Sequence, residues 1–276
     1  MSTREHSRSR TGIAYRRFGS GPPILLLHGL PGSGASWLQV AKLLSGRHEL
    51  VLPDLLGFGA SAKPASLPEL RASAQADALA GLLGGLAIEP VAVVGHDFGG
   101  PVAVELAGRH PGLVSHLGVL ATNLFPDTPI PFPLSTAAWP LLGRVARRLL
   151  FSQPSLRMML RTGTGRPRVA LDPSVYLGDA AQRRAIHTIF AGSLTSLHEL
   201  YAPVERHARA IDVPTFAGWG TRDPFFSVKE GERAAAALST TLRLYNDAGH
   251  FLPEERPHEV ARDLAALVST TPIDET

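Results

Sequence analysis

The stretch from Val91 to Gly100 constrains the fold of this chain most strongly, and its sequence is VAVVGHDFGG. Its first half is apolar and mostly β-branched, which is typical of a buried strand in a parallel sheet. The residues that follow Gly100 carry apolar side chains at helical spacing, and Pro101 lies in the first turn, where its missing N–H costs little. The stretch therefore predicts a strand, a tight turn and a helix, with Asp97 in the turn.

The glycines on both sides of Asp97 match the pattern of a nucleophile elbow, in which a strained turn presents the central side chain. The usual serine is replaced by aspartate. A carboxylate is already ionised at neutral pH, so it attacks without a base and forms an alkyl ester with a saturated carbon. Alkyl halides and epoxides are the natural targets of such a group. The alternative is that Asp97 only caps the helix that follows.

Composition limits the remaining choices. The 276 residues allow one large domain or two small ones, and a hydrophobic content of 44% supports a sizeable core. The net charge is only +3 and the arginines are scattered, so nucleic acid is not an expected partner. The absence of cysteine excludes disulfides, thiolate nucleophiles and zinc–thiolate sites. We expect no metal and no cofactor.

Two features bear on the location of the protein. The first ten residues are polar and contain no apolar leader, and no later segment reaches the length of a membrane span. We therefore expect a soluble, cytoplasmic protein without a membrane partner.

The rest of the chain predicts alternating strands and helices, which is typical of a mostly parallel α/β sheet. Residues 123–205 differ, because a proline-rich entry is followed by amphipathic helices without a strand-like run. We expect a helical cap there, inserted between core segments 1–122 and 206–276. Strands are predicted at residues 12–19, 23–27, 49–53, 91–94, 113–121, 214–220 and 241–245, and helices outside the cap at 36–44, 69–87, 101–107, 229–238 and 258–268.

An elbow nucleophile requires a base, a group that orients this base and an oxyanion hole. His250 lies on a loop after the last predicted strand and is the best candidate for the base. Asp223 follows the preceding strand and is the candidate orienting acid. The backbone N–H groups of Leu30 and Phe98 are the candidate oxyanion hole.

Other residues offer weaker alternatives for the orienting acid. Asp247 is close to His250 in sequence but resembles a turn residue, and Asn123 and Asp127 follow an earlier strand. Seven other histidines are interpreted as surface or packing residues: His96, His110, His116, His187, His198, His207 and His258.

Five motifs, in this order along the chain, resemble the α/β-hydrolase superfamily in its aspartate-nucleophile branch, which holds epoxide hydrolases and haloalkane dehalogenases. They are HGLP at 28–31, PDLLGFGAS at 53–61, GHDFGG at 95–100, GTRD at 220–223 and GHFLPE at 249–254. The resemblance implies an eight-stranded, mostly parallel sheet flanked by helices, with an inserted helical cap. It also implies a catalytic triad of Asp97, His250 and Asp223.

The two reactions of this branch need different partners in the cap. A leaving halide needs side-chain donors, which Leu30 and Phe98 lack, so that only Trp139 is a candidate. An epoxide oxygen needs an acid, for which Tyr176 and Tyr201 are candidates. We therefore rank epoxide hydrolysis of a small hydrophobic substrate, with water as co-substrate, above haloalkane dehalogenation.

Two further alternatives stay open. They are a non-hydrolytic tailoring enzyme and a non-catalytic small-molecule receptor on the same scaffold. A homodimer is also left open.

Overall fold

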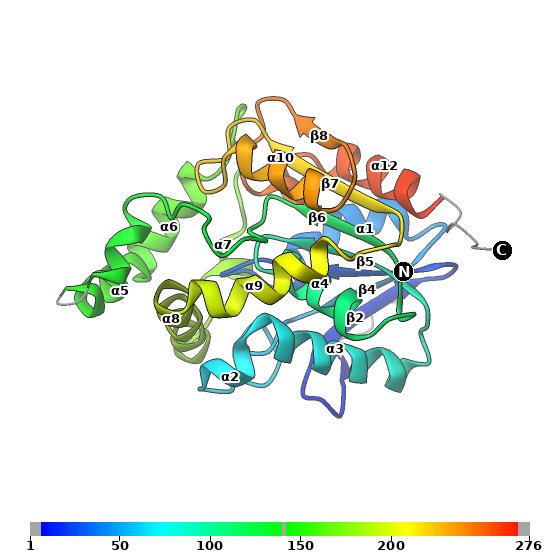
Figure 1. Cartoon of the computed structure of the whole chain (residues 1–276), viewed down its shortest axis with the longest axis horizontal. Coiled ribbons are helices and arrows are strands. Elements are labelled where there is room, and N and C mark those ends of the chain that lie inside the picture. The colour runs from blue at the N-terminus through cyan, green and yellow to red at the C-terminus, as the bar shows by residue number, and fades with distance from the viewer. Residues whose placement is uncertain (1–6, 140–141, 270–276) are drawn as a thin grey trace.

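The computed structural model describes residues 7–139 and 142–269. Within them, eight strands form one sheet in the order β1-β2-β4-β3-β5-β6-β7-β8 (Figure 1). The pairs β1–β2 and β2–β4 are antiparallel, and all other neighbours are parallel. This confirms the predicted eight-stranded, mostly parallel sheet. The strands are β1 (Ser7–Arg8), β2 (Ala14–Gly19), β3 (Pro23–Leu27), β4 (Glu49–Pro53), β5 (Val91–His96), β6 (Val114–Leu120), β7 (Thr215–Gly220) and β8 (Leu242–Tyr245).

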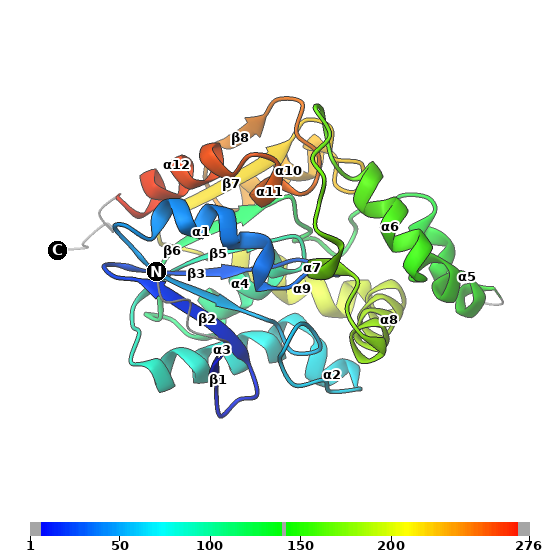
Figure 2. The ribbon, with the colours of Figure 1, turned by 180° about the vertical axis from the view of Figure 1, so that it is seen from behind.

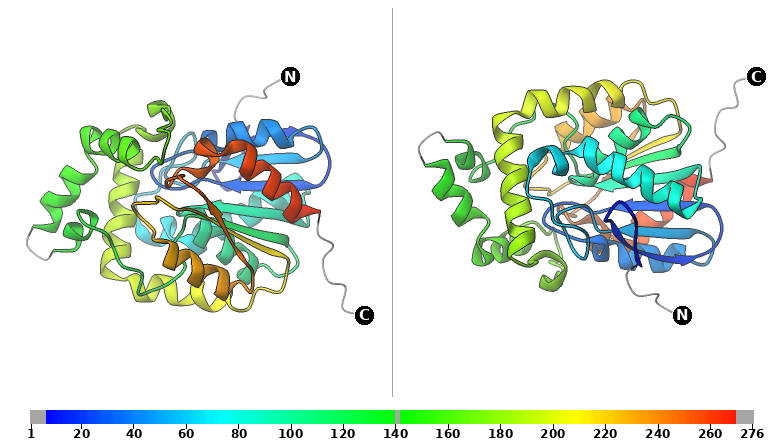
Figure 3. Two further views of the ribbon diagram at one scale, coloured as in Figure 1. Left: turned by 90° about the horizontal axis from the view of Figure 1, so that it is seen from above. Right: turned by 90° about the horizontal axis from the view of Figure 1, so that it is seen from below.

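Helices cover both faces of the sheet, as Figure 3 shows from above and below. Ile24 and Leu26 of β3 lie in one apolar cluster with α1 (Leu38–Leu44) and α12 (Pro257–Val268). Leu25 and Leu27 lie in the other cluster, with α3 (Ala72–Leu86), α4 (Gly99–Arg109) and α10 (Val228–Ala237). The alternation follows from the two-residue period of a strand. A strand buried on both faces therefore has to be apolar throughout.

The described residues between β6 and β7 form helices and connecting loops without a strand, as expected for the cap. Its helices are η2 (Leu134–Ala138), α5 (Gly143–Leu150), α6 (Gln153–Thr162), α7 (Pro173–Tyr176), α8 (Ala180–Thr195) and α9 (Leu197–Ala208). Figure 2 shows α5, α6 and α8 at the end of the sheet opposite the C-terminus. Helix α9 contacts both α8 and α4. The predicted boundary at residue 205 falls within α9, and the three domain ranges stay predictions that include the undescribed residues 1–6, 140–141 and 270–276.

Several predicted helices have different bounds in the structure. The helix expected at 36–44 is divided into η1 (Gly34–Trp37) and α1, and the one expected at 69–87 into α2 (Leu67–Leu70) and α3. The second break lies at Arg71, whose backbone is extended with φ −64° and ψ 158°. A short helix, α11 (Leu252–Glu255), precedes α12. None of the described helices is long and apolar enough to cross a membrane.

The carboxyl ends of the parallel strands lie at one edge of the sheet, which faces the cap. Leu30, Asp97, Asp223 and His250 follow β3, β5, β7 and β8 respectively. Parallel strand order therefore brings four loops that are distant in sequence to one place.

Candidate active site

Asp97 occupies the sharp turn between β5 and α4. Its φ is +51°, in the left-handed region that a residue with a side chain rarely adopts. The turn is held from both sides, because the Asp97 N–H donates to the Leu120 carbonyl (3.1 Å) and the Asp97 carbonyl accepts from the Gly100 N–H (2.9 Å). The Thr122 hydroxyl donates to the same carbonyl (2.5 Å). The strained residue is thus fixed by its neighbours.

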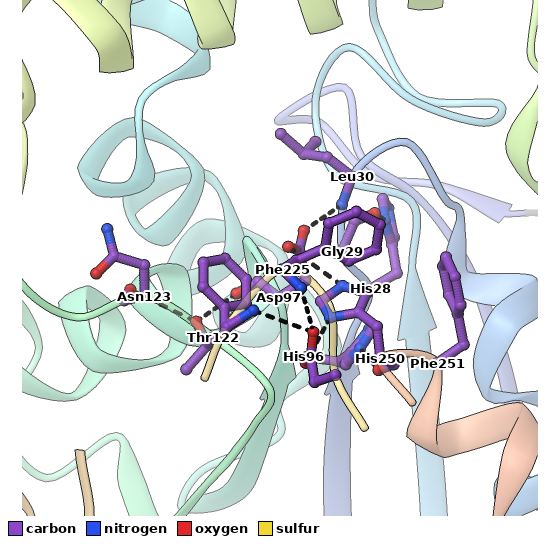
Figure 4. A network of polar contacts seen from close by, with 12 residues as sticks. His28, Gly29, Leu30, His96, Asp97, Thr122, Asn123, Phe225, His250 and Phe251 are labelled. Carbon is purple, nitrogen blue, oxygen red and sulfur yellow. Dashed lines mark hydrogen bonds and ion pairs between the residues drawn. The ribbon is translucent and has the colours of Figure 1, made fainter. Parts of the chain in front are cut away.

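The Asp97 carboxylate contacts two of the predicted partners (Figure 4). Its Oδ1 accepts from the Leu30 N–H at 2.6 Å, and its Oδ2 lies 3.5 Å from His250 Nε2. His250 Nδ1 lies 2.9 Å from Asp223 Oδ2, which fixes the ring. The structure therefore brings together Asp97, His250, Asp223 and the Leu30 N–H.

Asp223 is itself firmly held. Its side chain is fully buried, and its Oδ1 accepts from the N–H groups of Phe225 (2.8 Å) and Phe226 (3.0 Å). These bonds leave Oδ2 for the imidazole of His250. The three weaker candidates have other partners than His250: Asp247 pairs with Arg222, Asp127 pairs with Arg233, and Asn123 accepts from the Phe125 N–H.

The loop that carries Leu30 is positioned by His28, which sequence analysis did not single out as an individual residue. The Leu55 N–H donates to His28 Nε2 (2.9 Å), so the ring proton is on Nδ1 and is donated to the Gly29 carbonyl (2.9 Å). Burial lowers the pKa of His28, which keeps the ring neutral. Phe98, the other predicted oxyanion residue, is the N-cap of α4, where backbone N–H groups are free of helical partners.

Asp97 and His250 each shift the pKa of the other in the direction that favours its charged form. Burial raises the pKa of Asp97, but the hydrogen bond and positive charge of His250, together with smaller effects that include the Leu30 N–H, bring the pKa below its usual value. Burial lowers the pKa of His250, whereas Asp223 and then Asp97 raise it, to about 10. At neutral pH the free site therefore holds an Asp97 carboxylate beside a protonated His250.

His96 has a structural role that sequence analysis assigned only to packing. Its Nε2 lies 2.8 Å from the His250 carbonyl, and the two rings are 4.8 Å apart. Burial and the charge of His250 lower the pKa of His96 to about 4, so the ring is neutral and its Nε2–H donates to the carbonyl. His96 thus supports the backbone of His250 from the last residue of β5. Its position next to Asp97 was the only signal in the sequence.

A cavity of about 130 Å³ lies between the sheet edge and the cap. Asp97 and His250 line it from the core, and most of the remaining lining is apolar. Its other polar side chains are Asn123, Thr128, Ser193 and Tyr201.

The structure places the three predicted cap residues differently. Tyr201 lines the cavity, and its pKa is raised by burial and by the charge of Asp97, so the phenol keeps its proton. Tyr176 is outside the cavity, because its hydroxyl donates to Glu254 and its ring packs on Phe251. Trp139 is also outside the cavity and is 52% exposed. Of the three, only Tyr201 is among the residues that line this cavity. Sequence does not define which way a cap residue faces.

The described residues contain no cluster of three or more His, Cys, Asp or Glu side chains that could hold a metal ion.

Comparisons with known proteins agree with this architecture. The family model described as alpha/beta hydrolase fold matches residues 22–257. A cis-3-alkyl-4-alkyloxetan-2-one decarboxylase of Xanthomonas campestris is 26% identical, over 96% of this chain and 95% of its own. A fluoroacetate dehalogenase of Burkholderia is 41% identical over 106 residues, 37% of this chain and 34% of its own.

Solved structures show the same fold. The structure of the epoxide hydrolase CorEH superposes with a TM-score of 0.77 at 23% identity, covering 95% of this chain and 98% of that one. With a family model that covers most of its length, the chain belongs to the α/β-hydrolase family.

Proposed function

We propose that this hydrolase is an epoxide hydrolase, which forms an alkyl ester on Asp97 and releases a diol. One observation carries the proposal: a charged carboxylate and a protonated phenol, Tyr201, line the same largely apolar cavity. Opening an epoxide needs a nucleophile for carbon and an acid for oxygen, and these two groups supply them.

In the first step, the Asp97 carboxylate forms a bond to one epoxide carbon while the bond between that carbon and the ring oxygen breaks. The oxygen takes the proton of Tyr201. A hydrogen bond with Ser193 lowers the pKa of Tyr201, as expected when the serine hydroxyl is the donor. The phenol proton is then free for the substrate.

Esterification changes the state of His250. Two of the interactions that raise its pKa, the charge of Asp97 and the hydrogen bond to Asp97, disappear with the carboxylate. His250 then gives its proton to the Tyr201 phenolate, through solvent, and becomes a base. The first step therefore prepares the group that the second step needs.

In the second step, neutral His250 takes a proton from water, and the hydroxide attacks the Asp97 carbonyl carbon. The Leu30 N–H, already 2.6 Å from Oδ1, stabilises the oxyanion together with the Phe98 N–H. Collapse expels the diol alkoxide, which takes the proton of the new Asp97 carboxylic acid. Asp97 is again charged and His250 again protonated, so the cycle adds one water to one epoxide.

Haloalkane dehalogenation is the second candidate, and it is favoured by the partial match to the fluoroacetate dehalogenase. The cavity argues for the epoxide, because its lining contains no tryptophan and Leu30 and Phe98 have no side-chain donor for a halide.

A His250→Gln variant tests both the intermediate and the leaving group. We expect it to accumulate an adduct on Asp97 when incubated with styrene oxide, and intact-mass spectrometry should show the full mass of the epoxide. A matched bromide, (2-bromoethyl)benzene, would instead add its mass less that of HBr. Adduct and halide release from the bromide, without any adduct or diol from the epoxide, would reverse the ranking. A variant with no adduct from either compound would contradict the ester mechanism.

A pair of tyrosine variants tests the acid. Tyr201→Phe should slow ester formation from styrene oxide by roughly 100-fold, the usual contribution of general acid catalysis. Tyr176→Phe is the matched control and should leave this rate unchanged, because Tyr176 lies outside the cavity. Equal effects of the two substitutions would exclude Tyr201 as the acid.

A further inference from the structure

The cavity contains one polar region that the proposed mechanism does not use. Asn123 follows β6, and Thr128 lies in the proline-rich entry of the cap. Both line the cavity together with Asp97, and Pro129, Ile130 and Pro131, which follow Thr128 in the chain, line it as well. A polar pair in such apolar surroundings calls for an explanation.

The orientation of the Asn123 amide is fixed by the backbone. The Phe125 N–H donates to Asn123 Oδ1 at 2.8 Å, and the Thr128 hydroxyl oxygen lies 2.5 Å from the same oxygen. A backbone N–H cannot face an NH₂ group, so the amide oxygen has to lie on this side. The Asn123 nitrogen consequently points away from the Phe125 N–H.

The nitrogen has no protein partner among residues 7–139 and 142–269, although it carries two hydrogens. An unpaired donor in an apolar cavity loses free energy unless a ligand or water accepts its hydrogen bond. A ligand with a correctly placed acceptor therefore gains affinity that a hydrocarbon ligand cannot gain.

The donor is also held in place by the residues around it. Thr128 is buried, and its hydroxyl also lies 2.8 Å from Glu230 Oε2 of α10. Its single hydrogen serves one of the two oxygens at a time, so the Phe125 N–H is the contact that fixes the amide. The residue before Asn123 is Thr122, whose hydroxyl donates to the Asp97 carbonyl. The amide is thus tied to the same backbone unit as the nucleophile.

We propose that the Asn123 amide nitrogen is a specificity-determining donor, which binds a hydrogen-bond acceptor on the carbon chain of the substrate. A carbonyl oxygen fits this donor best, because it is a strong acceptor that carries no proton of its own. That the reactive group is an epoxide rests on the proposed function, whereas the acceptor subsite does not. The proposed epoxide hydrolysis and the acceptor subsite together indicate substrates that are epoxides with a carbonyl group near the ring.

Unreactive ligands test the subsite without any turnover. Phenylacetone and isobutylbenzene have nearly the same shape, but only the ketone carries an acceptor. We expect the wild-type protein to bind phenylacetone about tenfold more tightly, as isothermal titration would show, because one neutral hydrogen bond is worth about that factor. Equal affinity for the two compounds would overturn the proposal.

Two variants identify the donor. Asn123→Asp keeps an oxygen for the Phe125 N–H but replaces the NH₂ group by a second oxygen. It should lose the preference for phenylacetone and gain one for the alcohol 1-phenylpropan-2-ol. Thr128→Val removes the nearby hydroxyl and leaves the amide, so the preference for the ketone should persist. A ketone preference that survives in Asn123→Asp would overturn the proposal.

Turnover separates this role from a catalytic one. If styrene oxide and an epoxide bearing a ketone are both substrates, Asn123→Asp should lower kcat/KM for the second more than for the first. An equal loss on both would show that Asn123 acts on the reacting oxygen and would contradict the subsite. If neither epoxide gives a diol, the proposed function fails, while the binding result still decides on the subsite.

Discussion

At the scale of single residues, the proposed reaction depends on the charges of Asp97 and His250. The carboxylate is kept ionised by the protonated imidazole, and the imidazole is kept protonated by two carboxylates. Esterification of Asp97 removes one of those carboxylates. The same residue pair therefore has one charge state suited to attack on carbon and another suited to the activation of water.

This switch predicts different pH profiles for the two steps. The pKa of Asp97 is lowered and that of His250 is about 10, so neither group titrates between pH 6 and 9 and ester formation should not change over this range. In the ester the pKa of His250 is lower than the value of about 10 in the free enzyme. The neutral, basic fraction of His250 therefore increases with pH until the pH exceeds this lowered pKa. Ester hydrolysis, measured in a single turnover, should therefore become faster with rising pH. A hydrolysis rate that falls with pH would contradict the role of His250.

Residues with a chemical role were predictable from sequence to different degrees. Asp97, His250 and Asp223 each follow a strand of the sheet, so strand order alone was enough to bring them together. His28 and His96 act through bonds to backbone atoms, and nothing in the sequence indicates which carbonyl or N–H a buried histidine will meet. Tyr201 and Tyr176 were equal candidates for the acid, because the side of each cap helix that faces the core is set by packing and not by the local sequence.

At the scale of secondary structure, the elbow depends on glycines that admit no side chain. A Cβ atom on Gly99 would lie 2.4 Å from the Leu27 carbonyl oxygen, and one on Gly95 would lie 2.0 Å from the Gly99 carbonyl oxygen. Because these two positions have no side chain, strand β5 and helix α4 can approach each other closely. This part of the fold was predictable because the constraint lies within six consecutive residues.

Substitution of Gly99 should therefore be costly. Gly99→Ala is expected to lower the free energy of unfolding by about 3 kcal/mol, since the new methyl group meets backbone atoms that cannot turn aside. Gly85 in α3 is the matched control, because a Cβ there meets nothing within 4 Å. Gly85→Ala should raise the free energy of unfolding by about 0.5 kcal/mol through helix propensity. Urea titrations that show similar effects for both would refute the close approach.

At the scale of the whole molecule, Glu255 joins the cap to the loop of His250. Its Oε2 accepts from the N–H groups of Gly165 in the cap (2.7 Å) and Gly249 (2.9 Å), and its Oε1 accepts from the Phe251 N–H (2.9 Å). The His250 N–H in turn donates to the cap carbonyl of Gly163 (2.8 Å). These bonds join segments that are far apart in sequence, so they could not be predicted from local patterns.

Two neighbouring glutamates allow a matched test of this link. Glu255→Gln should lower the free energy of unfolding by about 1 to 3 kcal/mol, because its NH₂ group must face a buried backbone N–H. Burial raises the pKa of Glu254 to about 8, and its hydrogen bond uses only the oxygen that faces Tyr176. Glu254→Gln resembles this neutral acid and should leave the free energy of unfolding at pH 7 nearly unchanged. Equal losses in the two variants would show that the backbone N–H groups are not what Glu255 stabilises.

The most direct test of the central claim is a single turnover of an epoxide in H₂¹⁸O with excess enzyme. The ester mechanism predicts that the new oxygen of the diol comes from Asp97 and is unlabelled, and that mass spectrometry finds ¹⁸O in the peptide containing Asp97. A diol labelled with ¹⁸O, together with an unlabelled Asp97 peptide, would mean that water attacks the substrate directly and would contradict the account.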